Sequence, residues 1–482
     1  MVGKQDRWQD ELFVACSLRE LIPADHILRR VDKVLDLSWL RGEVKDLYDE
    51  YQGRPSIDPE AAVRLMLAGF FQGIVHDRKL MREAQVNIAI RWFAGYKLHE
   101  RLPDHSSLTR IRQRWGEARF KRIFQKTVGQ CVKAGLVDGE TTHMDATLIR
   151  ADVSWESLVD RHAEKVLAEN SDESRGGDDG GSDGKRRGRP RRREKAPKKM
   201  SLTDPDATMT TSCNSFHMEP SYKQHTAVDD KAGVIVDVGV TTGEQSEGEQ
   251  LAGQIQRVEE NTGKKVETLT GDAAYGHARN YRKLEDRGTE AIIPPQKEAV
   301  RAGCLPLRRF KYDAMHQAVR CPAGRILRRS GCTANGAIYK AKAHDCGRCR
   351  LRNRCFSPRQ KFRQVQIVDG YEALLRARRK RLRWGLRERD KYHRHRWRVE
   401  GIHGEAKTQH GLRRATRRGL WNVAIQAYLT AAVMNLKRLA ALLCLIFLAE
   451  ILCRKHMRAH PDSHGRHPTL EPHGAALYAA AA

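Results

Sequence analysis

The stretch QHTAVDDKAGVIVDVGV, residues 224–240, decides the fold. Two runs rich in β-branched residues, 224–228 and 233–240, flank a polar, glycine-ended turn, which is the pattern of a β-hairpin. Outward from this hairpin, short strands alternate with helical segments, and such alternation favours a mixed α/β sheet. The other elements that we predict for this part of the chain are strands at 141–145, 266–270 and 292–293 and a helix at 277–286.

Residues 1–135 are predicted to be helical. Asp58 and Pro59 form a helix start, with a capping carboxylate followed by proline at the first helical position. A second start at residues 103–108 leads into a short basic helix. Several short helices with a basic one near the end favour a DNA-binding region of the helix-turn-helix kind. The alternative is a helical bundle with a solvated basic face. The expected DNA contacts are Arg110, Arg112 and Arg114.

The charge balance points to nucleic acid as a partner. The chain has 88 Lys and Arg against 60 Asp and Glu, a net charge of +28 over 482 residues. Such an excess favours binding to phosphates and argues against a cationic ligand. The eleven cysteines and the absence of an export signal at the start predict reduced thiols or metal ligands in a cytosol rather than a disulfide framework. The apolar run 439–452 is too short for a membrane span, which needs about 20 residues, so we expect a buried helix.

Residues 169–200 are predicted to be a disordered linker. An acidic, glycine-rich run is followed by a run of Lys and Arg, and apolar residues that could offset the entropy of ordering are lacking. Arg187 and Arg189, in Arg-Gly-Arg-Pro, resemble an AT-hook that reads a narrow minor groove. Non-specific attraction to phosphates remains the alternative for this segment.

Three acidic residues stand out by their positions. Asp145 is in a predicted strand, Asp272 directly follows another, and Glu400 is on a helix rich in cations. Carboxylates suit Mg²⁺, and two such ions about 3.5–4 Å apart stabilise the attacking and leaving oxygens of phosphodiester chemistry. Three converging acids would form such a site. The alternative for each is a capping or solvated carboxylate.

The helix that carries Glu400 has an unusual face. Arg396 and Lys407 are expected to bind phosphates on either side of an ion held by Glu400, whereas Glu405 lies about 140° round the helix from Glu400 and is excluded as a ligand. An ordinary amphipathic helix would show an apolar stripe there. A solvated face with ion pairs remains the alternative. The residues that share a stripe of about 80° are Tyr392, Arg396, Glu400, His403 and Lys407.

Cysteines gather between the second Asp and the Glu. Cys346-x2-Cys349-x5-Cys355, with Cys321 upstream, would supply four soft ligands for a closed, structural Zn²⁺ site. His344 is a possible substitute ligand. Reduced cysteines packed in a small basic insertion are the alternative. Arginines beside them suit contact with a DNA backbone: Arg348, Arg350, Arg352 and Arg354.

Three motifs carry a resemblance to a known family. They are His143-Met144-Asp145-Ala146-Thr147, Gly271-Asp272-Ala273-Ala274-Tyr275 and Arg396-x3-Glu400-x6-Lys407. The sequence resembles a bacterial insertion-sequence transposase of the DDE type, in the branch with a Tyr-Arg-Glu-Lys motif. The likeness covers about residues 15–440. Ala274 replaces the glycine that usually precedes the tyrosine of the second motif.

The resemblance implies a catalytic domain with the RNase H-like fold and a metal pair, Mg²⁺ or Mn²⁺, held by Asp145, Asp272 and Glu400. It implies nicking of double-stranded DNA at the element's terminal inverted repeats and attack of the freed 3′-hydroxyls on target DNA. It also implies a homodimer in the DNA complex and a bacterial cytoplasmic, nucleoid-associated location. Tyr275, Tyr392 and Trp397 are further candidates for a DNA role, with packing as the default.

We therefore predict a multidomain α+β protein with a helical DNA-binding region, an RNase H-like mixed sheet flanked by helices and a Cys-containing insertion. Two alternatives to a transposase remain: a catalytically inactive, repressor-like DNA-binding protein, and a metal-dependent nuclease that hydrolyses without joining. The expected segments are a helical region 1–135, a first catalytic strand and helix 136–168, the linker 169–200, the core 201–300, the insertion 301–365, C-terminal catalytic helices 366–453 and a disordered tail 454–482.

Overall fold

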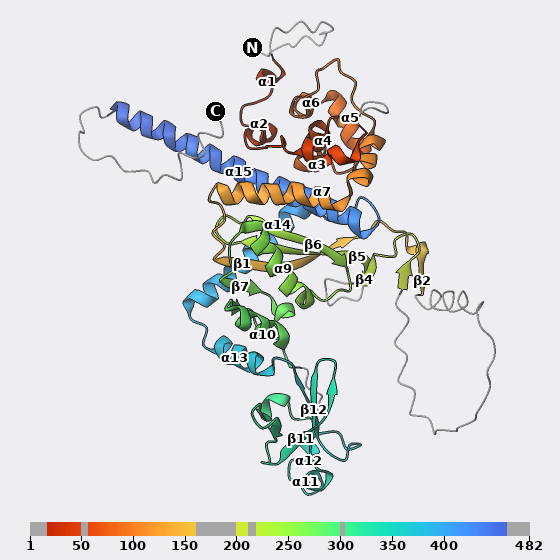
Figure 1. Cartoon of the computed structure of the whole chain (residues 1–482), viewed down its shortest axis with the longest axis vertical. Coiled ribbons are helices and arrows are strands. Elements are labelled where there is room, and N and C mark those ends of the chain that lie inside the picture. Colours follow the sequence, from red (N-terminus) through yellow and green to blue (C-terminus); the bar gives the residue numbers. More distant parts are fainter. Residues whose placement is uncertain (1–16, 50–55, 161–198, 211–217, 299–303, 460–482) are drawn as a thin grey trace, which may run out of the picture.

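The structure is a computed structural model that describes residues 17–49, 56–160, 199–210, 218–298 and 304–459. Arg187 and Arg189, almost all of the predicted linker and residues 460–482 of the predicted tail lie outside the described residues. Residues 454–459, also predicted to be part of the disordered tail, are helical. Figure 1 shows a bundle of short helices at one end, two long helices crossing below it, a sheet beneath them, and a small separate lobe at the other end.

The N-terminal region is helical, as predicted. Asp58 accepts hydrogen bonds from the backbone N–H groups of Glu60 and Ala61 and begins a helix with Pro59 at its first position, which confirms the expected start. The kink in the last helix of this region lies at Gly116, whose φ is 68°. The elements are α1 (Leu18–Leu21), α2 (Ile27–Asp32), α3 (Leu40–Val44), η1 (Lys45–Leu47), α4 (Pro59–Phe71), α5 (Asp77–Val86), α6 (Ile88–Ala94) and α7 (His105–Lys133).

A mixed sheet forms the centre of the molecule. Strand β1 (Thr141–Arg150) pairs antiparallel with β5 (Glu219–Asp229) and parallel with β7 (Thr268–Gly271). The predicted hairpin is confirmed, because β6 (Ile235–Thr242) pairs antiparallel with β5. At the other edge β8 (Glu290–Ile292) pairs parallel with β7. Three short strands extend the sheet beyond β5: β2 (Leu158–Asp160), β3 (Lys199–Ser201) and β4 (Thr208–Thr210).

Helices cover this sheet. Helix α14 (Leu386–Gln409) lies along β1 and β7, and α9 (Glu247–Thr262) packs against β6. Helix α15 (Leu420–Ala459) packs against both α7 and β6, as Figure 1 shows for α7. The remaining elements near the sheet are η2 (Trp155–Ser157), η3 (Ala273–Tyr275), α10 (Ala278–Arg287) and α13 (Tyr371–Leu382).

Helix α15 belongs to the core. Among the described helices it is the one long and apolar enough to cross a membrane, over Leu420–Ile446. Its side chains Val433, Met434 and Leu436 are fully buried in the protein. This part of the helix packs its apolar surface against α7 and the sheet. The apolar run predicted to be a buried helix, 439–452, is helical, but in its described part only Leu439 and Ala440 are buried and Leu445 is 65 % exposed.

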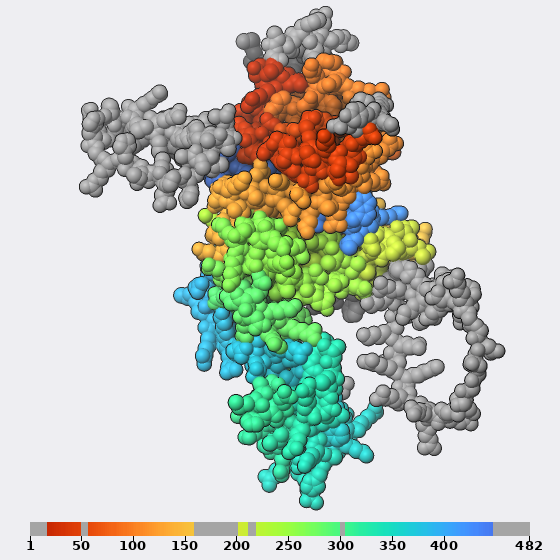
Figure 2. All heavy atoms as spheres, in the orientation of Figure 1, coloured from red at the N-terminus to blue at the C-terminus, as the bar shows by residue number. Residues whose placement is uncertain are grey.

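The Cys-bearing insertion folds around its own sheet, which the sequence did not predict. Its five strands are antiparallel in the order β13-β12-β11-β10-β9. In Figure 2 it forms a distinct lobe at the bottom of the view. Its elements are η4 (Leu307–Arg309), β9 (Lys311–Asp313), β10 (Ala318–Arg320), β11 (Ile326–Thr333), β12 (Gly336–Lys340), α11 (Ala343–Gly347), α12 (Arg352–Cys355) and β13 (Gln364–Val368).

Candidate metal centre

Two of the predicted acids meet beside the central strands. Strands β1 and β7 are parallel neighbours in which Met144 is opposite Gly271, so the residues that follow, Asp145 and Asp272, emerge side by side. Asp272 also accepts a hydrogen bond from the backbone N–H of Ala274, which fixes its side chain at the start of η3. The sheet register thus produces the convergence of two aspartates that the sequence indicated.

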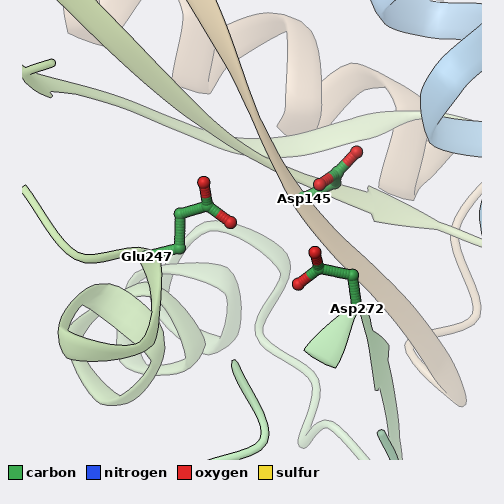
Figure 3. A group of neighbouring side chains, drawn as sticks. All are labelled: Asp145, Glu247 and Asp272. Carbon is green, nitrogen blue, oxygen red and sulfur yellow. The ribbon is translucent and has the colours of Figure 1, made fainter. Parts of the chain in front are cut away.

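A third carboxylate, Glu247, completes the group. Each of Asp145, Glu247 and Asp272 offers an oxygen, and these oxygens all lie within 4.8 Å of one another. Figure 3 shows the three side chains reaching toward a common space from β1, the start of α9 and the end of β7. Their oxygens and their spacing fit a hard divalent cation such as Mg²⁺.

Glu247 was not predicted from the sequence as a site residue. An acid in the first turn of a helix is usually interpreted as a partner of the helix dipole. Glu249 lies in the same turn, so the sequence does not distinguish it from Glu247. The signal that could have found it is the glycine that follows. A Cβ at Gly248 would lie 2.4 Å from His277 Cδ2 and 3.0 Å from the Ala274 carbonyl oxygen. Gly248 therefore allows α9 to begin directly against the loop that follows Asp272.

The electrostatics of the group also suit a cation. Burial raises the pKa of Asp145 to about 7, and the charges of Asp272, Glu247 and Glu400 contribute to the rise. Burial likewise raises the pKa values of Asp272 and Glu247. Buried carboxylates that repel one another are stabilised in their charged form by a divalent ion between them.

Glu400 lies at the margin of this group. Its carboxylate is 61 % exposed and pairs with Arg396, with Nε and Oε1 3.4 Å apart. Its charge contributes to the raised pKa of Asp145, but it is outside the group within 4.8 Å. The structure thus brings Asp145 and Asp272 together and leaves the third predicted acid nearby and solvated.

Other residues of the predicted α14 stripe face the site. His403 Nδ1 is 3.8 Å from Asp145 Oδ2, and its Nε2 is 3.1 Å from Thr226 Oγ1. Burial lowers the pKa of His403 to about 3, so this imidazole is neutral. Burial also lowers the pKa of Lys407, on which the charge of Asp145 acts in the opposite direction. Glu405, by contrast, pairs with Lys437 of α15.

The three candidate aromatic residues differ in accessibility. Tyr275 is 1 % exposed, so its ring is unavailable for stacking on a base in this structure. Tyr392 packs between Trp384 and His395, with ring centroids 5.4 and 6.1 Å away. Trp397 is 56 % exposed, and a guanidinium lies 4.4 Å from its ring centroid. Trp397 is thus the one of the three whose side chain is mainly exposed to solvent.

The basic helix start in α7 divides into two kinds of arginine. Arg110 and Arg114 are exposed. Arg112 is not available to DNA in this structure, because its side chain is 6 % exposed and its Nη1 pairs with Asp77 Oδ2 at 2.6 Å. Its charge balances a buried carboxylate between α5 and α7, so the expectation of a DNA contact there is corrected to a structural ion pair.

The four cysteines of the insertion share a cavity, but among the described residues they do not form a group with ligand atoms all within 4.8 Å of one another, as the three carboxylates do. Cys321, Cys346, Cys349 and Cys355 all line one small cavity of about 20 Å³. Burial raises the pKa of the Cys355 thiol to about 11, and the other three cysteines contribute to this rise. Cys349 Sγ accepts a hydrogen bond from the backbone N–H of Leu351 at 3.4 Å. The proposed substitute, His344, is 74 % exposed and is not among the residues that line this cavity.

Comparison with protein families agrees with this architecture. Residues 16–114 match a transposase domain of the DUF772 family, and residues 320–440 match a transposase DDE domain. The first match covers the N-terminal helices, and the second includes Glu400 on α14. No curated protein matches the sequence.

These matches fit the fold and the site. The helical N-terminal region and the mixed sheet flanked by helices are consistent with the RNase H-like fold of a DDE domain. That domain indicates an enzyme of the polynucleotidyl-transferase or nuclease type that acts on DNA with divalent metal, and a triad of carboxylates is present. The two family matches thus support an insertion-sequence transposase of the DDE type.

Proposed function

We propose that this transposase cuts double-stranded DNA at the terminal inverted repeats of its own element and joins the freed 3′ ends to target DNA. The observation that carries the proposal is the meeting of Asp145 and Asp272 beside Glu400 on a strongly basic helix. In the first step a water oxygen attacks phosphorus and the 3′ oxygen leaves as a hydroxyl. In the second step that hydroxyl attacks a phosphate of the target, whose own 3′ oxygen leaves.

We propose that Asp145, Asp272 and Glu400 hold two divalent ions, Mg²⁺ or Mn²⁺. Bound there, the ions would activate the attacking oxygen and neutralise charge on the leaving one. The protein's own side chains then position the DNA. Arg396, 66 % exposed, would bind a phosphate in solvent, and the half-buried Lys407 one closer to the carboxylates. His403 packs beside Asp145 and is neutral, so it does not compete with a metal ion for the Asp145 carboxylate.

A basic surface next to the site suits a DNA backbone. The end of α13 and the start of α14 form a hollow of about 350 Å³ lined mostly by cations. Arg110 and Arg114 offer exposed charges on the helical region. Two DNA ends must be held at once for joining, so we propose a homodimer in the DNA complex. The hollow is lined by Arg376, Arg379, Lys380, Arg383, Trp384 and Glu388.

The test is a cleavage assay with purified protein, Mg²⁺ and DNA that contains the element ends. Wild-type protein should give nicks with 3′-hydroxyls and then joined products, and Asp145→Asn should abolish both while DNA binding persists. Asp286→Asn, at an exposed aspartate on α10, is the matched control and should act as wild type. Nicking by Asp145→Asn at the wild-type rate would refute the proposal.

The same assay separates the two alternatives. A repressor-like protein would bind the ends and leave them intact in every metal tested. A hydrolytic nuclease would nick the DNA through Asp145 but give no joined product, even with target DNA in excess.

We also propose a structural zinc ion bound by Cys321, Cys346, Cys349 and Cys355. Their shared cavity of about 20 Å³ has room for a single small group, and four soft sulfur ligands suit a closed tetrahedral site. Elemental analysis of purified protein should find about one zinc per chain. Cys346→Ser should lose it, while Cys332→Ser, at an exposed cysteine on β11, should keep it. Zinc-free wild-type protein would contradict this assignment.

A further inference from the structure

We infer that Glu247 is a ligand of the catalytic divalent ion. With Asp145 and Asp272 it forms a three-carboxylate site that is complete before DNA binds, and Glu400 joins this site only when DNA is present. The inference rests on the proposed function for its catalytic meaning, but the ion site itself can be tested without DNA.

The geometry of the three acids supports a preformed site. Their nearest oxygens all lie within 4.8 Å of one another. Oxygen ligands of one Mg²⁺ lie about 3–4 Å apart, because each Mg–O bond is about 2.0–2.1 Å, so only small shifts are needed. The side chains of Asp145 and Glu247 are 22 % and 20 % exposed, which leaves them open to an ion on one side.

Tyr275 gives an independent sign that a group binds here. Its hydroxyl is buried and has no hydrogen-bond partner in the protein. Its ring packs on the residue before Asp272, since a Cβ at Gly271 would be 3.2 Å from Tyr275 Cδ2. The charges of Glu247, Asp145 and Asp272 all act on this side chain. A buried, unpartnered hydroxyl on which the charges of all three acids act would gain a hydrogen-bond partner when a hydrated ion or a substrate oxygen binds beside it.

The ordinary explanation of Glu247 as a helix-dipole partner is insufficient. Glu249 is in the same first turn and is exposed to solvent, which is where such an acid usually lies. Glu247 instead enters a partly buried acidic group, where repulsion opposes its charge. Lys223 offsets part of this charge, with its Nζ 3.3 Å from Glu247 Oε1, and leaves Glu247 able to face the aspartates.

The state of Glu400 explains why it would join later. Without DNA its carboxylate pairs with the exposed Arg396. A DNA phosphate that binds Arg396 competes for the same guanidinium and releases the carboxylate. Glu400 is then free to approach Asp145, on which its charge already acts.

The experiment measures Mn²⁺ binding to the full chain by calorimetry in the absence of DNA. We expect Glu247→Gln to weaken binding at least about tenfold, the effect of losing one charged ligand. Glu400→Gln and the matched control Glu249→Gln should stay within about twofold of wild type. In the cleavage assay, both Glu247→Gln and Glu400→Gln should lose most nicking, whereas Glu249→Gln should not.

Folding of the variant is checked by thermal unfolding in EDTA, where Glu247→Gln should be at least as stable as wild type because a repulsive charge is removed. A folded Glu247→Gln that binds Mn²⁺ like wild type overturns the inference, as does loss of DNA-free binding in Glu400→Gln. If Mn²⁺ binding needs Glu247 but wild-type protein never cuts DNA, the ion site stands and the proposed function fails. If Glu247→Gln cuts DNA normally while Asp145→Asn does not, the proposed function stands and the role of Glu247 as a ligand fails.

Discussion

Asp145 is a carboxylate whose protonation differs between the folded and unfolded chain. Burial and neighbouring acids raise its pKa from 3.8 to about 7. The folded state therefore favours the protonated form, and this contribution to stability is present below pH 3.8 and is lost as the pH rises through about 7. Metal binding, which needs the charged form, becomes stronger over the same upper range.

We predict that Asp145→Asn stabilises the metal-free protein at high pH. In EDTA near pH 8 its Tm should exceed that of wild type by a few degrees, and the difference should shrink as the pH falls below about 7, because folded wild-type Asp145 then takes up its proton. Circular dichroism melts at several pH values measure this. Mg²⁺ should raise the Tm of wild type at pH 8 and not that of the variant. If the Tm values of wild type and variant changed with pH in parallel, the raised pKa of Asp145 would be disproved as the cause.

Arg112 and Arg110 are close in sequence, but we predict that substituting Arg112 lowers stability whereas substituting Arg110 lowers DNA affinity. Arg112→Ala removes one of the two arginines that pair with Asp77 among the described residues and should lower the free energy of unfolding by about 3 kcal/mol. Arg110→Ala removes an exposed charge, so stability should be unchanged and DNA affinity should fall. Urea unfolding and gel-shift titration measure the two effects. Unchanged stability of Arg112→Ala would show that the ion pair is dispensable.

At the scale of elements, the start of α9 against the loop after Asp272 controls the site. Gly248→Ala places a methyl group 3.0 Å from the Ala274 carbonyl oxygen, a backbone atom that cannot rotate away. We predict a loss of about 1–3 kcal/mol in stability and several-fold weaker Mn²⁺ binding, because Glu247 is displaced. Gly253→Ala, in the same helix with only ordinary van der Waals contact, should be neutral or stabilising. Equal effects of the two substitutions would contradict this role of Gly248.

Elements with a regular apolar pattern were predictable from the sequence, and others were not. The β5–β6 hairpin and β1 have β-branched, buried runs that identify strands directly. Strand β11 is almost wholly exposed and rich in arginine and glycine, so it has no alternation to detect, and the insertion's sheet was missed. Asp145 lies in a predicted strand and Asp272 directly follows one, whereas the position of Glu247 depends on how α9 packs, which no local pattern reveals.

At the scale of the whole molecule, Asn435 joins the C-terminal helix to the central sheet. Its Oδ1 accepts from the Ile235 N–H and its Nδ2 donates to the Ile235 carbonyl, both at 2.9 Å, although the residues are 200 positions apart. This side chain is fully buried. It thereby satisfies both backbone groups at the first residue of β6.

We predict that Asn435→Leu costs about 3 kcal/mol of unfolding free energy, because a buried donor and acceptor lose their partners. Asn422→Ala, which removes a hydrogen bond to Arg418 near the solvent-exposed start of α15, should cost under about 1 kcal/mol. Urea denaturation of both variants provides the comparison. Similar small losses would mean that water replaces the Asn435 contacts.

The packing of α15 across α7 and β6 also has a genetic consequence. A copy of the gene with a stop codon before residue 420 would encode a protein that lacks one whole side of its interior. Such a product would expose the apolar surfaces of α7 and β6 and be degraded by cellular proteases. Truncated copies of this kind would therefore not inhibit transposition by intact copies. No folded fragment would remain to bind the DNA ends that the intact protein acts on.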